Sequence, residues 1–257
     1  MCAGSIGLAN AGVVGSKHDL TAATGGAQQL TAATDNVCVF CHTPHGSDTT
    51  APVPLWNKVL TPGTAYQQYS DLQLPTFDSA EAPVGSVSLA CLSCHDGTQA
   101  MDVVINMPGT GGHNISGAEI DGTGVGVMTG TPVPMLGVDL TNDHPISMQY
   151  AAGGPVAADP DGQYTGNLGD PDFKKPFKET INNNPIWWVD SPIGTTGTRE
   201  KTDMILYARN DLGTVQPFVE CGSCHDPHND TTAGPASVQF LRIDNSASRI
   251  CIACHEK

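Results

Sequence analysis

The residues best suited to chemistry in this chain are cysteines and histidines that recur in one spacing. A pattern of cysteine, two residues, cysteine and histidine occurs four times, at 38–42, 91–95, 221–225 and 251–255. Two thiols at this spacing can each form a thioether with one vinyl group of a haem, and the next histidine can then bind the iron. One match would be weak evidence, but four predict a protein with four covalently attached c-type haems.

The pattern assigns a role to each of its residues. The predicted thioether-forming residues are Cys38, Cys41, Cys91, Cys94, Cys221, Cys224, Cys251 and Cys254. The predicted proximal iron ligands are His42, His95, His225 and His255.

Two other readings of the cysteine pairs are less favourable. Zinc sites also use paired cysteines, but they do not require a histidine directly after every pair. Disulfides between such close neighbours are more often redox-active than structural. The ninth cysteine, Cys2, has no partner in the pattern. It is open whether Cys2 is a free thiol, a processing relic or an intermolecular link.

The remaining histidines match the number of axial positions that four haems need. The histidines outside the motifs are His18, His45, His113, His144 and His228. Four irons have eight axial positions and the chain has nine histidines. We therefore predict four six-coordinate, bis-histidine haems with one histidine left over, and hence no open iron coordination site.

Two of these histidines lie very close to a proximal ligand in the sequence. The first and third motifs both continue as Cys-x-x-Cys-His-x-Pro-His, which places His45 and His228 three residues beyond a proximal histidine. Each then lies on the same side of that haem and cannot easily reach its opposite face. We expect His45 and His228 to bind neighbouring haems, which would pack the haems closely enough for electron transfer.

The histidine count also bears on domain organisation. Beyond residue 145 there are two motifs but only one histidine outside them, His228. At least one C-terminal haem must therefore take a ligand from the N-terminal part, from another chain or from a methionine such as Met204. We expect one tetrahaem domain over 1–257, with haems 1 and 2 in 1–150, a connecting segment at 151–204, and haems 3 and 4 in 205–257.

The composition predicts little regular structure. The chain has 29 glycines and 19 prolines, and only 5% of its residues are aromatic. Glycine and proline are well above their usual share of about 12% but below the level of disordered chains, and four haems in the interior would make up for the few aromatic side chains. We expect a mostly irregular, loop-rich fold with few short helices and minor strands packed around four covalently bound haems.

Local patterns predict a few elements. The run 101–107 favours a strand, and 200–210 is the best helix candidate. Trp187 and Trp188 should cover the core or a haem edge. Four aspartates (Asp159, Asp161, Asp170 and Asp172) suggest calcium, but the calcium-loop spacing fails because its glycine position holds Tyr164. We therefore favour a solvated acidic loop.

Charge and hydropathy limit the partners. The net charge of −15 argues against nucleic acid, because phosphate binding requires a basic surface. No apolar run approaches the ~18 residues of a membrane span. The stretch 2–15 lacks the charged front of a signal peptide, so we expect a mature or nearly mature chain. Haem attachment of this type takes place outside the cytoplasm, which implies export.

Several stretches together resemble a known group of proteins. They are residues 15–20, 38–45, 54–57, 91–97, 140–146 and 221–228. They are similar to extracellular multihaem c-type cytochromes of metal-reducing microbes, and most of all to the tetrahaem subunits that polymerise into cytochrome nanowires, the OmcE-like family. Segments 109–130 and 151–200 carry no such likeness.

The resemblance implies roles for individual histidines. It makes His18, His45, His144 and His228 the distal ligands and His113 the spare or alternative one. A subunit of such a filament can lend a distal histidine to its neighbour, and His45 or His18 is the candidate. The implied partners are further copies of the chain, other redox cytochromes and extracellular electron acceptors, and the implied location is extracellular or at the cell surface.

Three functions compete at this point. The first is electron transfer along four bis-histidine haems in an extracellular filament, without enzymatic activity. The second is a soluble periplasmic tetrahaem shuttle. The third is a multihaem reductase, which requires an open haem iron; the surplus of histidines and the lack of a Cys-x-x-Cys-Lys motif argue against it.

Overall fold

The computed structural model gives the positions of most of the chain. It describes residues 12–21, 34–60, 65–109, 112–120, 126–128, 134–229 and 240–256. Cys2, whose role the sequence leaves open, lies outside these residues.

Short helices carry three of the four motifs. The α-helices in the described part of the chain are α1 (Ser86–His95), α2 (Cys221–Cys224) and α3 (Arg249–Cys254). The 3-10 turns there are η2 (Tyr69–Leu72), η3 (Tyr150–Ala152) and η4 (Ser246–Ser248). Each α-helix contains both cysteines of a motif, so each helix presents the two thiols of one motif.

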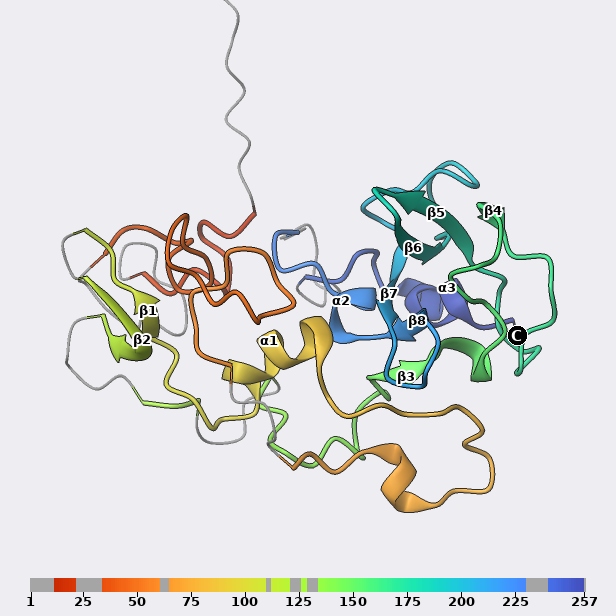
Figure 1. Ribbon diagram of the computed structural model, residues 1–257, viewed down its shortest axis with the longest axis horizontal. Helices are drawn as coiled ribbons and strands as arrows, with labels where there is room; N and C mark the ends of the chain where they lie inside the picture. The colour runs from red at the N-terminus through yellow and green to blue at the C-terminus, as the bar shows by residue number, and fades with distance from the viewer. Residues whose placement is uncertain are drawn as a thin grey trace, which may run out of the picture.

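Most strands belong to one six-stranded antiparallel sheet. Its strands are β3 (Met148–Gln149), β4 (Gly162–Gln163), β5 (Phe177–Ile181), β6 (Asn184–Val189), β7 (Met204–Arg209) and β8 (Gln216–Val219), in the order β3-β8-β7-β6-β5-β4. A second sheet pairs β1 (Val103–Asn106) with β2 (His113–Glu119). The two sheets lie at opposite ends of the molecule, and α1 and α2 lie side by side between them (Figure 1).

The expectation of a loop-rich fold with minor strands is wrong, because the six-stranded sheet runs through the segment expected to be connecting loop. The hairpin of β5 and β6 turns through Asn182 and Asn183, whose φ angles are 50° and 65°. Two adjacent residues with positive φ are typical of the type I′ turn, which asparagine tolerates and which matches strand twist. The strand expected within 101–107 is confirmed as β1.

The helix expected over 200–210 is also wrong, because Met204–Arg209 forms strand β7. Its side chains alternate in burial over 204–207, with Met204 and Leu206 buried and Ile205 and Tyr207 partly exposed. The strand pairs with β6 on one side and β8 on the other. These sheet partners override the intrinsic helix preference of methionine, leucine and alanine.

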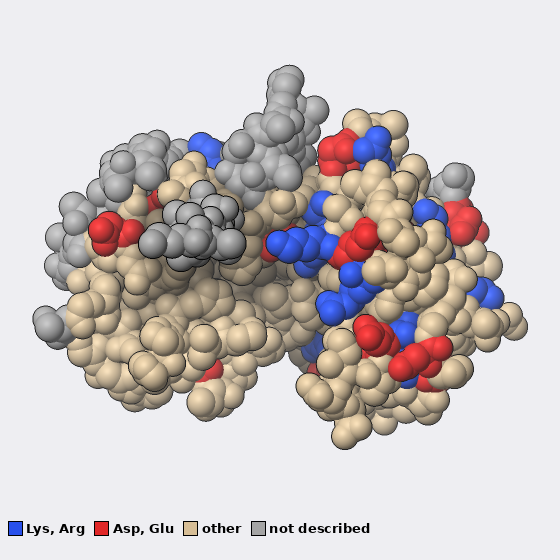
Figure 2. Space-filling model, turned by 90° about the horizontal axis from the view of Figure 1, so that it is seen from above, with Lys and Arg blue, Asp and Glu red and all other residues tan. Residues whose placement is uncertain are grey.

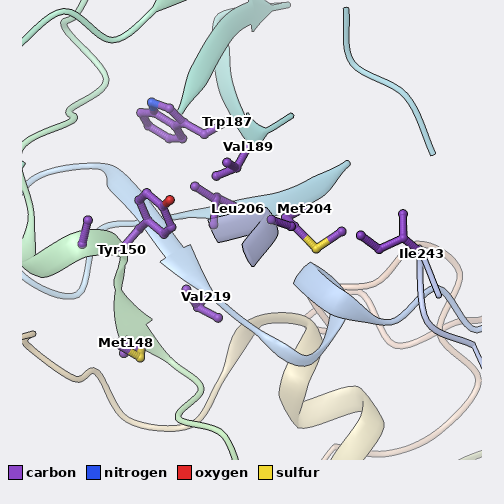
Figure 3. Close-up of a cluster of buried hydrophobic side chains, with 10 residues drawn as sticks. Met148, Tyr150, Trp187, Val189, Met204, Leu206, Val219 and Ile243 are labelled. Atoms are coloured by element: carbon purple, nitrogen blue, oxygen red, sulfur yellow. The ribbon is translucent and has the colours of Figure 1, made fainter. Parts of the chain in front are cut away.

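The largest apolar core lies on the six-stranded sheet. Figure 3 shows its members converging from β3, η3, β6, β7 and β8, with Ile243 approaching from the C-terminal segment. Trp187, Tyr150 and Met204 have no exposed surface, so the prediction that Trp187 covers the core is confirmed. Cys224 and Cys254 pack against this core, which seats the third and fourth motifs on the sheet.

The N-terminal part has smaller apolar clusters. One groups Trp56, Leu60 and Ala90 beside Cys41, and another groups Met101 and Met128 beside Cys94. Each cluster thus lies at a motif cysteine. Within the described residues no helix is both long and apolar enough to cross a membrane.

Charged side chains are distributed unevenly over the surface. On the face drawn in Figure 2, lysines and arginines alternate with acidic residues over the part that carries the six-stranded sheet. The part that carries β1 and β2 shows few charges on this face. The two signs of charge are thus mixed, and the described surface in this view shows no large basic patch.

The packing predicts unequal effects of one substitution at two leucines. Leu206 is 2% exposed and Leu212, beyond the end of the same strand, is 39% exposed. We expect Leu206→Ala to lower the free energy of unfolding of the purified protein by about 2–5 kcal/mol, and Leu212→Ala to change it by less than about 0.5 kcal/mol. Guanidinium unfolding followed by circular dichroism measures both. Equal losses would contradict the core described above.

Candidate functional site

Each motif forms one helical turn. The backbone N–H of His42 donates to the carbonyl of Cys38 at 2.7 Å, and those of His225 and His255 donate at 3.0 Å to Cys221 and Cys251. Residues three apart on a helix lie on one face, so this turn directs both thiols of a motif to the same side. That is the arrangement needed to hold two substituents of one planar ring system.

The four turns follow one another in space in the order of the sequence. Burial raises the pKa of the Cys41 thiol to about 12, with a contribution from the neighbouring Cys94. The thiols of Cys91 and Cys221 lie close together; this contact and burial raise the pKa of Cys91, whereas the same contact lowers the pKa of Cys221 against the effect of burial. The second motif therefore lies between the first and the third.

The third and fourth motifs are neighbours in the same way. Burial raises the pKa of Cys224 to about 11, and the thiols of Cys221 and Cys251 contribute to the rise. Burial, followed by the nearby Cys224, raises the pKa of Cys254. Each motif thus has a thiol near a thiol of the next motif, from the first motif to the fourth.

Two proximal histidines each face a histidine from a distant part of the chain. The ring centroids of His42 and His228 are 6.0 Å apart, and those of His18 and His95 are 6.1 Å apart. A metal–imidazole bond is about 2 Å long, so two imidazoles on opposite sides of one ion have centroids roughly 6 Å apart. Both pairs therefore have the separation of axial ligands to a single iron.

Hydrogen bonds at the other ring nitrogen orient these imidazoles. Nδ1 of His42 lies 2.9 Å from the carbonyl oxygen of Pro54, and Nδ1 of His95 lies 2.6 Å from that of Pro134. Nδ1 of His228 lies 3.4 Å from a carboxylate oxygen of Asp226. Metal-binding histidines usually make such a bond with the nitrogen that does not bind the metal, so Nε2 is left as the ligand.

His18 is held similarly by a distant backbone group. Its ring hydrogen-bonds to the backbone of Pro227 and stacks on Phe240, with centroids 4.1 Å apart. Burial, followed by the charge of nearby His95, lowers the pKa of His18 to about 4. The imidazole is therefore neutral at neutral pH, which is the form that binds a metal. These residues fit an axial position on a haem.

Of the other predicted ligands, His225 lies near the second pair, because its charge contributes to the lowered pKa of His18. His45 and His144 are exposed, and Nδ1 of His144 lies 3.0 Å from the carbonyl of Pro145. His113, also exposed, has Nε2 3.2 Å from the carbonyl of Gly46. His255 packs on Phe173 with ring centroids 4.3 Å apart. Ring contacts at the spacing of axial ligands thus join His42 with His228 and His18 with His95.

The acidic loop has a structural partner. The ammonium group of Lys178 lies 3.2 Å from a carboxylate oxygen of Asp161, which also accepts a hydrogen bond from Thr180. Within the part of the chain that the structure describes, no three histidine, cysteine or acidic side chains gather in a metal-binding group. The histidines that meet do so in pairs.

The sequence did not reveal the groups that orient the imidazoles. The carbonyls of Pro54, Pro134 and Pro227 belong to ordinary backbone, and only Asp226, two residues before His228, was recognisable as a local partner. A further group of buried polar residues, around Glu220, also carries no motif.

The comparison with known proteins agrees with the cysteine pattern. A family model described as a doubled CXXCH motif matches residues 216–257, which contain the third and fourth motifs. No curated protein matches the chain. The doubled motif indicates a multihaem c-type cytochrome with covalently bound haem and an electron-transfer role.

Covalent attachment predicts a defined loss of mass. Replacing both Cys251 and Cys254 by alanine removes the two thiols of the fourth motif, so we expect the denatured protein to lose the mass of one haem. Cys2→Ala, which changes a cysteine outside the motifs, should lose none. Mass spectrometry of the intact chains measures both, and an unchanged haem mass in the double variant would contradict attachment at this motif.

Proposed function

We propose that this chain is an electron-transfer protein that carries four bis-histidine haems in one domain. The observation that carries the proposal is the unbroken succession of attachment turns, in which a thiol of each motif lies near enough to a thiol of the next for one of the two to show a shifted pKa. Electron transfer needs cofactors in close succession, and this order supports a path from motif one to motif four.

The haems would supply one-electron exchange at iron, and the chain would hold and insulate them. The paired cysteines fix each ring at two points. His42 and His228 would bind the first iron, and His95 and His18 the second. The backbone and carboxylate partners of these imidazoles keep each ring in one orientation, which limits reorganisation when the charge at the metal changes.

Two bound imidazoles per iron leave no position for a substrate. This supports electron transfer over a multihaem reductase, which needs an open axial position. Bis-histidine ligation also favours low reduction potentials, since a methionine ligand such as Met204 would raise them. Met204 has no exposed surface and packs in the sheet core.

The assignment of His18 can be tested against that of His113. We expect His18→Ala to convert one haem from low-spin to high-spin, because the second iron loses its distal ligand. His113→Ala should leave all haems low-spin. Electron paramagnetic resonance of the oxidised protein measures the spin state. Carbon monoxide binding to reduced wild-type protein would contradict full axial ligation.

We also propose that the chain assembles into an extracellular filament in which a distal histidine crosses between subunits. The family resemblance suggests the assembly, and the pairing of His18 with His95 within one chain favours His45 over His18 as the ligand that is lent. His45 is exposed and follows its own proximal histidine too closely to cap the same iron. The partners would be other copies of this chain, redox cytochromes and external electron acceptors.

A histidine of one subunit that binds a haem of the next subunit would be needed both for assembly and for complete haem ligation. We expect His45→Ala to yield discrete particles and one high-spin haem, whereas His113→Ala should keep both the filaments and the low-spin haems. Negative-stain electron microscopy and paramagnetic resonance of the same samples measure the two effects. Discrete particles of the wild-type protein would instead favour a soluble periplasmic shuttle. Intact filaments in His45→Ala would contradict the role of His45 in assembly.

A further inference from the structure

A fully buried carboxylate lies where the second and third motifs meet. The Glu220 side chain has 0% exposure, and one of its oxygens accepts a hydrogen bond from the Arg209 guanidinium at 2.8 Å. Its other oxygen accepts from the hydroxyls of Ser88 at 2.5 Å and Ser147 at 3.2 Å. Both carboxylate oxygens are thus bound by donors from three separate segments.

The cluster joins the helix of the second motif to the turn of the third. Ser88 belongs to α1, and its hydroxyl oxygen accepts a hydrogen bond from the backbone N–H of Cys221 at 2.9 Å. Arg209 also reaches toward α1, because its guanidinium donates to the carbonyl of Pro83 at 2.8 Å. The same guanidinium donates to both carboxylate oxygens of Asp211, two residues further along the chain, at 2.9 and 3.0 Å. The elements α1, β7 and α2 are therefore bound to one another at one point.

Hydrogen bonds to a buried charge fix the position of α1 relative to α2 more strictly than apolar packing does. A buried charge is costly unless its partners lie at good hydrogen-bonding geometry, and the strength of a hydrogen bond falls steeply with distance and angle. A small slide of α1 along α2 would leave the Glu220 carboxylate without Ser88. Apolar side chains, by contrast, can repack with little loss.

The cluster around Glu220 fixes the relative position of two cysteines that are predicted to attach haem. Cys91, one turn after Ser88 on α1, and Cys221, the residue after Glu220, lie close together where α1 packs against α2. Each sulfur would be joined through one vinyl-derived carbon to the edge of its haem. The distance between the second and third haems therefore depends on how α1 lies against α2.

We propose that the cluster of Ser88, Glu220 and Arg209 is a positioning device that sets the contact between the second and third haems, and with it the electronic coupling between the two halves of the chain. The inference rests on the proposed attachment of haem at both motifs. Its residues touch no haem in this scheme and act through Cys91 and Cys221.

Two serines of one helix provide a matched test. Ser93 is also buried on α1, but its hydroxyl donates to the carbonyl of Ala90 within the same helix, at 2.7 Å. In the haem-loaded, full-length protein we expect Ser88→Ala to lose intensity in the bisignate Soret circular dichroism, which reports the distance and angle between neighbouring haems. We also expect a smaller separation of midpoint potentials, because the charge interaction between two haems weakens with distance. Ser93→Ala should keep both properties.

A second variant covers the case in which Ser88→Ala yields no loaded protein. Arg209→Lys keeps the charge, but an ammonium group cannot bind Glu220, Asp211 and Pro83 at once as the planar guanidinium does. The same loss of Soret intensity is expected. Wild-type dichroism and potentials in the variant that loads, or an equal loss in Ser93→Ala, would overturn the inference.

The proposed function is tested separately on the same samples. The haem mass of each intact chain and its low-spin absorbance show whether all four haems are attached and bis-ligated. A wild-type protein without haem at the second or third motif refutes the proposed function. A fully loaded Ser88→Ala protein with unchanged coupling refutes only the positioning role.

Discussion

The burial of the Glu220 carboxylate is the constraint on which the arrangement of the two halves depends. Strand β8 ends directly before it, β7 supplies Arg209, and α1 supplies Ser88. If a buried carboxylate such as that of Glu220 loses a partner, the folded state is destabilised by about 3–5 kcal/mol. The N-terminal motif helix cannot shift relative to the C-terminal sheet without that loss. The hydrogen bonds of Glu220 thus join α1 to the C-terminal sheet at this point.

The two halves bury their apolar surface by different means. The C-terminal half has a continuous core on the six-stranded sheet, built around Trp187 and Tyr150, with Cys224 and Cys254 against it. The N-terminal half has small clusters beside Cys41 and Cys94. We infer that bound haems contribute a larger share of the buried surface there. Its geometry should depend more on the cofactors than that of the sheet.

The histidine pairs show how distant segments combine into one binding unit. The first motif supplies His42, and His228 comes from just beyond the third motif; His18 precedes both and lies against His95. The adjacent residues Pro227 and His228 contact both pairs, since Pro227 binds the ring of His18. In the proposed scheme, one short segment would thus orient ligands for two neighbouring haems.

The sequence by itself determined the attachment chemistry, because two thiols and an imidazole on one helical turn are a local pattern that needs no distant partner. It also located β1 and the burial of Trp187. It did not reveal the six-stranded sheet, because the run at 204–209 has helix-favouring residues and becomes a strand only through pairing with β6 and β8. Only the tertiary structure decided which histidines meet and that Ser88 and Arg209 enclose Glu220. These contacts join residues far apart in the chain, and their geometry follows from packing rather than from spacing.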